Sequence, residues 1–299
     1  MSWILYTIAA TVFQTFRNLE QKALNVRLDA LTVSWSRYLL PLPFGLIVIF
    51  YTSSLVDKWF IIYCLITAFF QVAGNISLLQ TFKSKNFSIG IAFYKTETLQ
   101  AMIIGLLFLN EPISFNGFLA IMVAMSGVMI MSGLVFDGDV KKFIQSLGNK
   151  ATLYGLLTGF CFSISAFNLK FASETLLPFG YSNMKAAVTV LMWVICFQNA
   201  MFVIVKFYQK RLVKDLKSLL MLENKYAFFK TTVFSFLGSI CWFTAYAVGN
   251  VVYVKAVGQI EMVMAAVASH FILKERLKKM EALGIVLTTS GILGLIFFH

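Results

Sequence analysis

The chain has 299 residues, of which 59% are hydrophobic and only 13% are charged. A soluble domain carries about 25% charged residues, so this composition excludes an ordinary soluble fold and favours an integral membrane protein. The net charge of +12 does not indicate nucleic-acid binding, because the basic residues lie in short loops between apolar runs, where positive charge sets membrane topology.

The apolar runs predict an all-α integral membrane protein with ten transmembrane helices, since each crossing needs about 20 mostly apolar residues. Seven runs carry no charge, and they cover residues 38–56, 59–82, 112–136, 151–169, 186–205, 231–254 and 282–298. Three weaker runs contain ionisable residues, and they cover residues 3–16 continuing past Arg17, 87–109 and 251–273. We expect a break at Gly249-Asn250 between the eighth and ninth helices.

The longest connection, residues 206–230, is basic and amphipathic. It predicts a helix that lies in the membrane interface, with a partner-binding arm as the alternative. The four cysteines lie in apolar stretches, with no CxxC pair and no neighbouring histidine, so we expect buried thiols and neither metal nor cofactor.

A fixed offset of 164 residues aligns the two halves of the chain. The matched positions are Glu97 with Glu261, Glu111 with Glu275, Ser126-Gly127 with Ser290-Gly291, and Gly74 with Gly238. Several polar and glycine matches in one register are hard to obtain by chance in an apolar chain. The sequence therefore predicts a first five-helix repeat over 1–136, a connecting loop over 137–150 and a second repeat over 151–299.

An odd number of helices in each repeat makes the second repeat enter the membrane from the opposite side. Inverted repeats of this kind are the architecture that many secondary transporters use for alternating access.

The paired pattern of a glutamate, a short polar link and an apolar helix with Ser-Gly resembles the drug/metabolite transporter superfamily, in particular its ten-helix EamA-type members. The resemblance covers nearly the whole chain. It implies a multi-pass protein of the inner cell membrane, a basket of ten helices around a central cavity, and cytoplasmic termini.

The loop charges predict the opposite orientation. Eighteen of the 25 lysines and arginines lie in odd-numbered loops, and only Lys58 and Lys185 lie in even-numbered loops. Because positive loops stay in the cytoplasm, this bias places both termini outside.

Glu97 and Glu261 are the leading candidates for a substrate or proton site. Each lies about ten residues into its span, which is roughly 15 Å deep and near the midplane of the bilayer. A charge at that depth costs about 2.5–3.5 kcal/mol and normally faces a cavity or a partner. Both could face one central cavity; the alternative is a structural pair, for instance of Glu97 with Arg17 or Lys170.

Other polar residues within spans join the candidate site. Lys95 could meet a carboxylate or pair with a neighbouring helix. The remaining candidates are Gln14, Arg17 and Asn18, which form a stripe on the first helix with Gln21, together with Gln71, Asn75, Tyr94, Ser165, Asn168, Trp242 and Gln259. Lys255 and Arg37 lie near the starts of their spans, so we expect them to reach the membrane surface.

These features predict a secondary transporter of a small polar or zwitterionic, amino-acid-like metabolite, coupled to protons or working by exchange. The alternative is a membrane receptor or assembly subunit without transport. The chain lacks HExxH, GxSG and DDxxD motifs, so no enzyme activity is expected. The expected partners are the small-molecule substrate and the lipid bilayer, and the expected assembly is a monomer or a homodimer.

Overall fold

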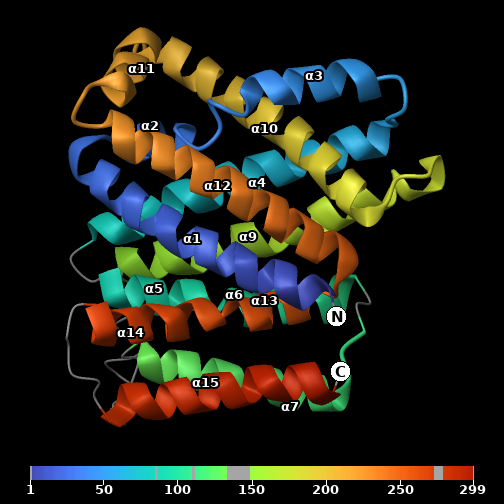
Figure 1. Cartoon of the computed structure of the whole chain (residues 1–299), viewed down its shortest axis with the longest axis vertical. Coiled ribbons are helices and arrows are strands. Elements are labelled where there is room, and N and C mark those ends of the chain that lie inside the picture. The colour runs from blue at the N-terminus through green and yellow to red at the C-terminus, as the bar shows by residue number, and fades with distance from the viewer. Residues whose placement is uncertain (1, 85–86, 110–111, 133–148, 273–278, 299) are drawn as a thin grey trace. The chain divides into compact units, whose positions relative to one another are not determined.

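Helices make up the fold in a computed structural model that describes residues 2–84, 87–109, 112–132, 149–272 and 279–298. No strand occurs in these ranges. The helices are α1 (Ser2–Arg27), α2 (Ala30–Trp35), α3 (Leu42–Thr52), α4 (Lys58–Lys83), α5 (Phe87–Lys95), α6 (Glu97–Phe108), α7 (Phe115–Met131), α9 (Lys150–Glu174), η1 (Leu177–Phe179), α10 (Asn183–Tyr208), α11 (Leu212–Leu220), α12 (Lys225–Val248), α13 (Val251–Gly258), α14 (Ile260–Ile272) and α15 (Lys279–Phe298) (Figure 1).

Six described segments are long and apolar enough to cross a membrane. They are Lys58–Lys83, Gly90–Phe108, Lys150–Phe179, Asn183–Tyr208, Lys225–Val248 and Lys279–Phe297. Two shorter helices, α3 and α7, are also apolar. These segments overlap eight of the apolar runs in the sequence, and the chain is accordingly a multi-pass membrane protein.

The second predicted span differs from the observed structure. In place of one helix over 38–56, a short α2 is followed by a turn and by α3, which has 11 residues. Pro41 and Pro43 explain the interruption, because proline cannot donate a helix hydrogen bond and is best tolerated in the first turn.

The break predicted at Gly249-Asn250 is confirmed. α12 ends at Val248, and the Asn250 side chain accepts hydrogen bonds from the backbone N–H groups of Val252 and Tyr253 at the start of α13. An asparagine in this position satisfies N–H groups that have no partner within the helix. The predicted connecting loop 137–150 and the matched pair Glu111 and Glu275 lie mostly or wholly outside the described residues.

The structure divides into two compact units, and each takes segments from both halves of the sequence. Unit 1 consists of residues 1–79 and 164–249, and unit 2 of residues 80–163 and 250–299. α4 and α9 continue from one unit into the other.

In unit 1, α1 and α12 lie side by side over much of their length (Figure 1). Gly238 lets α12 approach α1 closely, because a Cβ atom there would lie 3.2 Å from the Cβ of Phe13. α10 packs against both α3 and α12. Cys64 and Cys196 of this unit and Cys161 of unit 2 are buried thiols, as the sequence predicted, whereas Cys241 is half-buried.

In unit 2, α7 and α15 form an equally close pair (Figure 1). A Cβ atom at Gly127 would lie 2.5 Å from the backbone nitrogen of Thr288, and one at Gly291 would lie 2.6 Å from the carbonyl oxygen of Ala120. Small residues at such positions let two helix backbones meet in a membrane, where packing drives helix association. The contacts are reciprocal under the 164-residue offset, since Gly127 also meets Gly284 as Gly291 meets Ala120.

Candidate functional site

Two helices of unit 2 are broken at corresponding places. Thr96 separates α5 from α6, and Gln259 separates α13 from α14. Each break has a lysine in the last turn before it and a glutamate in the first turn after it. This order suits the helix dipoles, which favour cations at C-terminal ends and anions at N-terminal ends.

The charges at the two breaks pair crosswise. Lys95 Nζ lies 2.6 Å from Glu261 Oε2, and Lys255 Nζ lies 3.2 Å from Glu97 Oε2. The four side chains are only 2–13% exposed. The Lys95–Glu261 bond is short, as strong charge-assisted hydrogen bonds are, whereas the Lys255–Glu97 bond is longer. Together the two pairs allow four buried charges to coexist without a net charge.

Polar and aromatic groups surround the two ion pairs. The Thr98 hydroxyl donates to the carbonyl of Lys255 at 3.4 Å and accepts from Gln259 Nε2 at 2.8 Å. The ammonium of Lys95 lies 5.1 Å from the centre of the Tyr94 ring, within cation–π range. Tyr94, Lys95, Glu97, Gln259 and Glu261 were all predicted site residues, and the structure brings them together in unit 2.

The N-terminal part of α9 supports the first break. Gly155 and Gly159 let its backbone pass close to α5 and α6, because a Cβ atom at Gly159 would lie 3.2 Å from the Cα of Glu97. The Ser163 hydroxyl donates to the Glu97 carbonyl at 3.0 Å. Gln100 Nε2 donates to the Thr96 hydroxyl at 2.9 Å. The glycine spacing in the sequence thus corresponds to a tight helix contact beside the candidate site.

The expectation that Lys255 reaches the membrane surface is wrong. Its side chain is 2% exposed and pairs with Glu97. The lysine lies about one turn into its helix, but that helix ends after eight residues, so Lys255 occupies the last turn before the break. Residue counting assumed one continuous span and therefore missed this member of the site.

The polar stripe of α1 faces into unit 1. Arg17 is 6% exposed, whereas the neighbouring Phe16 and Leu19 are 49% and 61% exposed. The guanidinium of Arg17 donates to Asn18 Oδ1 at 2.9 Å. One turn earlier on the same stripe, Gln14 Oε1 accepts a hydrogen bond from the Trp242 indole at 3.0 Å.

The remaining predicted residues of unit 1 have separate partners. Gln71 Oε1 accepts from Gln198 Nε2 at 3.0 Å. Ser165 accepts through its backbone carbonyl from the Thr67 hydroxyl at 3.5 Å, and Asn168 donates to the carbonyl of Ile164 on its own helix. The Gln71 and Ser165 contacts tie helices together, which is the usual role of polar groups in membrane helices.

Arg37 also departs from expectation, because it is buried and does not reach the membrane surface. Its side chain is 6% exposed, and NH1 donates to Asn75 Oδ1 at 2.7 Å. The turn that carries it is held by Asn199, which donates to the carbonyl of Tyr38 at 2.8 Å and accepts from the Trp35 indole. The interrupted second span explains the burial, since the turn lies within unit 1 and not at the end of a long helix.

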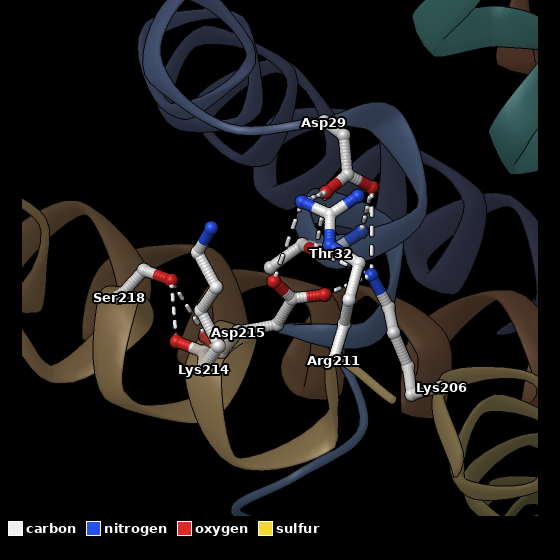
Figure 2. A network of polar contacts seen from close by, with 7 residues as sticks. All are labelled: Asp29, Thr32, Lys206, Arg211, Lys214, Asp215 and Ser218. Carbon is white, nitrogen blue, oxygen red and sulfur yellow. Dashed lines mark hydrogen bonds and ion pairs between the residues drawn. The ribbon is translucent and has the colours of Figure 1, made fainter. Parts of the chain in front are cut away.

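A separate cluster of charges fastens α11 to the segment between α1 and α2 (Figure 2). Lys206 is fully buried, and its Nζ lies 2.6 Å from Asp215 Oδ2 and 2.6 Å from the Thr32 hydroxyl. Asp29 and Arg211 complete the cluster, with a separation of 3.6 Å between NH2 and Oδ2. The basic segment 206–230 therefore contains a short helix, α11, held at its first turn by Asp215.

The pKa of the Asp29 carboxyl lies below its ordinary value of 3.8. Burial acts to raise the pKa, but hydrogen bonds from the Thr32 backbone and hydroxyl, and the charges of Lys206 and Arg211, outweigh it. The cluster thus holds Asp29 in its ionised form.

A groove of about 350 Å³ lies along α7 and α15, and none of the predicted site residues lines it. Its lining is Asn116, Leu119, Ala120, Val123, Ser290, Gly291 and Gly294. In the described part of the chain, no three His, Cys, Asp or Glu side chains gather in a way that could hold a metal ion.

Comparisons with known proteins agree with this helical architecture. A crystal structure of a protein superposes with a TM-score of 0.71 at 10% sequence identity, covering 99% of this chain and 97% of the other. At that identity the likeness shows the fold alone. No curated protein sequence gives a match.

The sequence model of the EamA-like transporter family matches residues 1–133 and, a second time, residues 149–297. Together the two matches extend over nearly the whole chain. Members of this family are membrane transporters of the drug/metabolite type. The chain belongs to the EamA-like transporter family.

Proposed function

We propose that this transporter moves a small polar or zwitterionic, amino-acid-like metabolite, and that the two crossed lysine–glutamate pairs of unit 2 form its substrate site. The two ion pairs at two helix breaks are the observation that carries the proposal. Discontinuous helices in transporters expose unpaired backbone groups and helix dipole ends at their binding sites.

A zwitterion matches the charges of this site. Breaking a buried ion pair by removing one partner costs about 3–5 kcal/mol, because it leaves an uncompensated charge. A ligand with both an ammonium and a carboxylate group could contact Glu97 or Glu261 with one end and a lysine with the other. Such a ligand leaves no net buried charge, whereas a ligand of a single charge does.

The mechanism that we propose is alternating access between two inverted five-helix repeats, residues 1–136 and 151–299, joined by 137–150 in a ten-helix protein of the inner cell membrane. The reciprocal contacts of α7 and α15 support it, because they follow the same offset as the two glutamates. A proton on Glu97 or Glu261 could replace a lysine as the neutralising partner, so proton coupling and substrate exchange are the two modes to compare. The protein would act as a monomer or a homodimer.

Flux measurements in proteoliposomes test the role of the glutamates. Glu97→Gln and Glu261→Gln each keep the shape of the side chain and remove its charge. We expect each variant to reduce amino-acid flux about tenfold or more, in line with loss of a charged hydrogen bond, while the protein still enters the membrane in folded form. Glu20→Gln is the matched control, since Glu20 pairs with the exposed Lys230 outside the site.

Full flux in both glutamine variants would reject the assigned site. A metabolite that binds to the wild-type protein but never crosses the liposome membrane would instead favour a receptor over a transporter.

A further inference from the structure

Arg37 is a buried cation in unit 1, and no carboxylate of the described residues pairs with it. NH1 donates to the neutral amide oxygen of Asn75, whereas Nε is buried and has no hydrogen-bond partner in the part of the chain that the structure describes. The centre of the Tyr38 ring lies 5.2 Å from the guanidinium carbon. A buried charge without an opposite charge costs free energy, and such a charge normally has a partner of opposite sign.

α4 and α1 bring further polar groups to this region. Asn75 also donates to the Ser34 hydroxyl at 2.8 Å, and Asn25 donates to the carbonyl of Leu79 at 3.0 Å. Asn75 and Leu79 are one turn apart on α4, so Arg37 and Asn25 meet the same face of that helix. Gln21 lies one turn before Asn25 and is fully buried.

α12 approaches the same turn. The Thr232 hydroxyl donates to the carbonyl of Ser36 at 2.6 Å, immediately before Arg37. Thr231 and Ser235 are neighbours of Thr232 on this helix and are 0% and 2% exposed.

Several buried polar atoms of these faces have no hydrogen-bond partner among the described residues. They are Gln21 Oε1 and Nε2, Asn25 Oδ1, Arg37 Nε and the hydroxyls of Tyr38, Thr231 and Ser235. Buried polar groups in native proteins nearly always have partners, and each exception needs a reason. They belong to segments that contact the turn of Arg37 or the stretch of α4 that holds it. Unpartnered polar atoms on elements that meet beside an unneutralised cation point to a polar ligand.

We propose that Arg37, with the amides and hydroxyls of α1, α4 and α12 around it, binds an oxyanion group, that is, a carboxylate or a phosphate. The planar guanidinium presents parallel N–H donors that fit the oxygens of such a group. Asn75 accepts a hydrogen bond from NH1 and thereby fixes the plane of the guanidinium group. The surrounding hydroxyls can donate to the oxygens of the bound oxyanion. This inference concerns residues outside the two ion pairs, so it goes beyond the proposed transport function.

Thermal unfolding of the purified full-length protein in detergent tests the oxyanion site. The soluble probes are succinate, glutamate and inorganic phosphate; phosphatidylglycerol represents a lipid headgroup; succinamide is the neutral analogue. Ionic strength is matched with sodium chloride, because salt screens charge effects. We expect at least one anionic probe to raise the Tm in a saturable way, since ligands that bind only the folded state stabilise it. Succinamide should not.

Arg37→Met should abolish the anion-dependent shift or weaken the apparent affinity about tenfold or more. Without anion the variant should be at least as stable as the wild type, because an unpaired buried charge has been removed. Arg27→Gln is the control, since it removes an exposed arginine charge from the same unit.

The probe that raises the Tm identifies the source of the oxyanion. A shift that needs Arg37 and appears with the soluble anions assigns the site to a solute, and one that appears only with phosphatidylglycerol assigns it to a lipid. No shift with any anion, or an equal shift in Arg37→Met, overturns the proposal. Should Arg37→Met fail to fold, Gln21→Leu decides: an undiminished anion shift there overturns the proposal, and a weakened shift at unchanged Tm supports it.

The binding measurement requires no transport. Loss of flux in the glutamate variants and loss of anion binding in the Arg37 variant are therefore independent results, and either proposal can fail alone.

Discussion

Each of three buried lysines is matched to a carboxylate. Lys95 pairs with Glu261, Lys255 with Glu97, and Lys206 with Asp215. All three lysine side chains are at most 4% exposed. In unit 2, each pair takes its lysine from one broken helix and its glutamate from the other, so the two pairs join α5 and α6 to α13 and α14.

Removing one member of a buried pair should be more harmful than removing both. Lys95→Met leaves Glu261 charged and buried, which we expect to destabilise the protein by about 3–5 kcal/mol. The double variant Lys95→Met with Glu261→Met should recover most of that loss. Thermal unfolding in one detergent, for the two single variants and the double variant, measures the coupling between the residues. If the double variant were no more stable than the single variants, the loss of stability would not come from the unpaired charge.

At the scale of elements, the seam between α7 and α15 depends on residues without side-chain bulk. Gly127 and Gly291 lie where a Cβ atom would meet the backbone of the facing helix. The residues immediately before them, Ser126 and Ser290, are exposed. The seam is therefore specific to one face of each helix.

Gly127→Leu should separate α7 from α15 and lower stability by about 1–3 kcal/mol or more, because overpacking forces the backbone to shift. Ser126→Leu is the matched control: it adds a similar volume one residue away on the exposed face and should change the Tm little. The measurement is the Tm of both variants in the same detergent. Equal effects of the two substitutions would contradict the close packing of the seam.

At the scale of the whole molecule, stability should depend on pH through the cluster at Asp29. Because its pKa is lowered in the folded protein, ionised Asp29 contributes stability that is complete above its ordinary, unfolded pKa of about 3.8 and is lost as the pH falls through the lower folded pKa. The Tm difference between the wild type and Asp29→Asn should therefore be constant from about pH 7 to pH 5 and shrink as the pH drops below about 4. A difference that is the same at pH 3 and pH 7 would contradict this role.

Long apolar runs predicted the helices well, because a crossing of the membrane requires about 20 apolar residues whatever its neighbours are. The start and end of α4, α9 and α10 lie within a few residues of the expected bounds, and the break at Gly249-Asn250 is confirmed. Local chemistry is sufficient for such features.

Features that depend on tertiary contacts were harder to predict. Glu97 and Glu261 stood out because a charge within a span is costly, but nothing in the sequence names Lys255 and Lys95 as their respective partners. No glycine or proline lies next to the break at Thr96, and Gly258 beside the break at Gln259 is one of many glycines within the spans. Arg37 and Lys255 were misplaced because depth was counted along continuous helices, and both lie beside interruptions.

Because Lys95 and Lys255 are buried, chemical labelling of their amines would measure how often the site around them opens to water. Amine-reactive reagents modify only ammonium groups that water can reach and that can lose a proton. In the described structure both amines are covered and held in ion pairs, so the rate at which each is labelled measures how often its pair parts. Peptide mass spectrometry after timed labelling would follow that event without any attached probe, in the protein's own lysines.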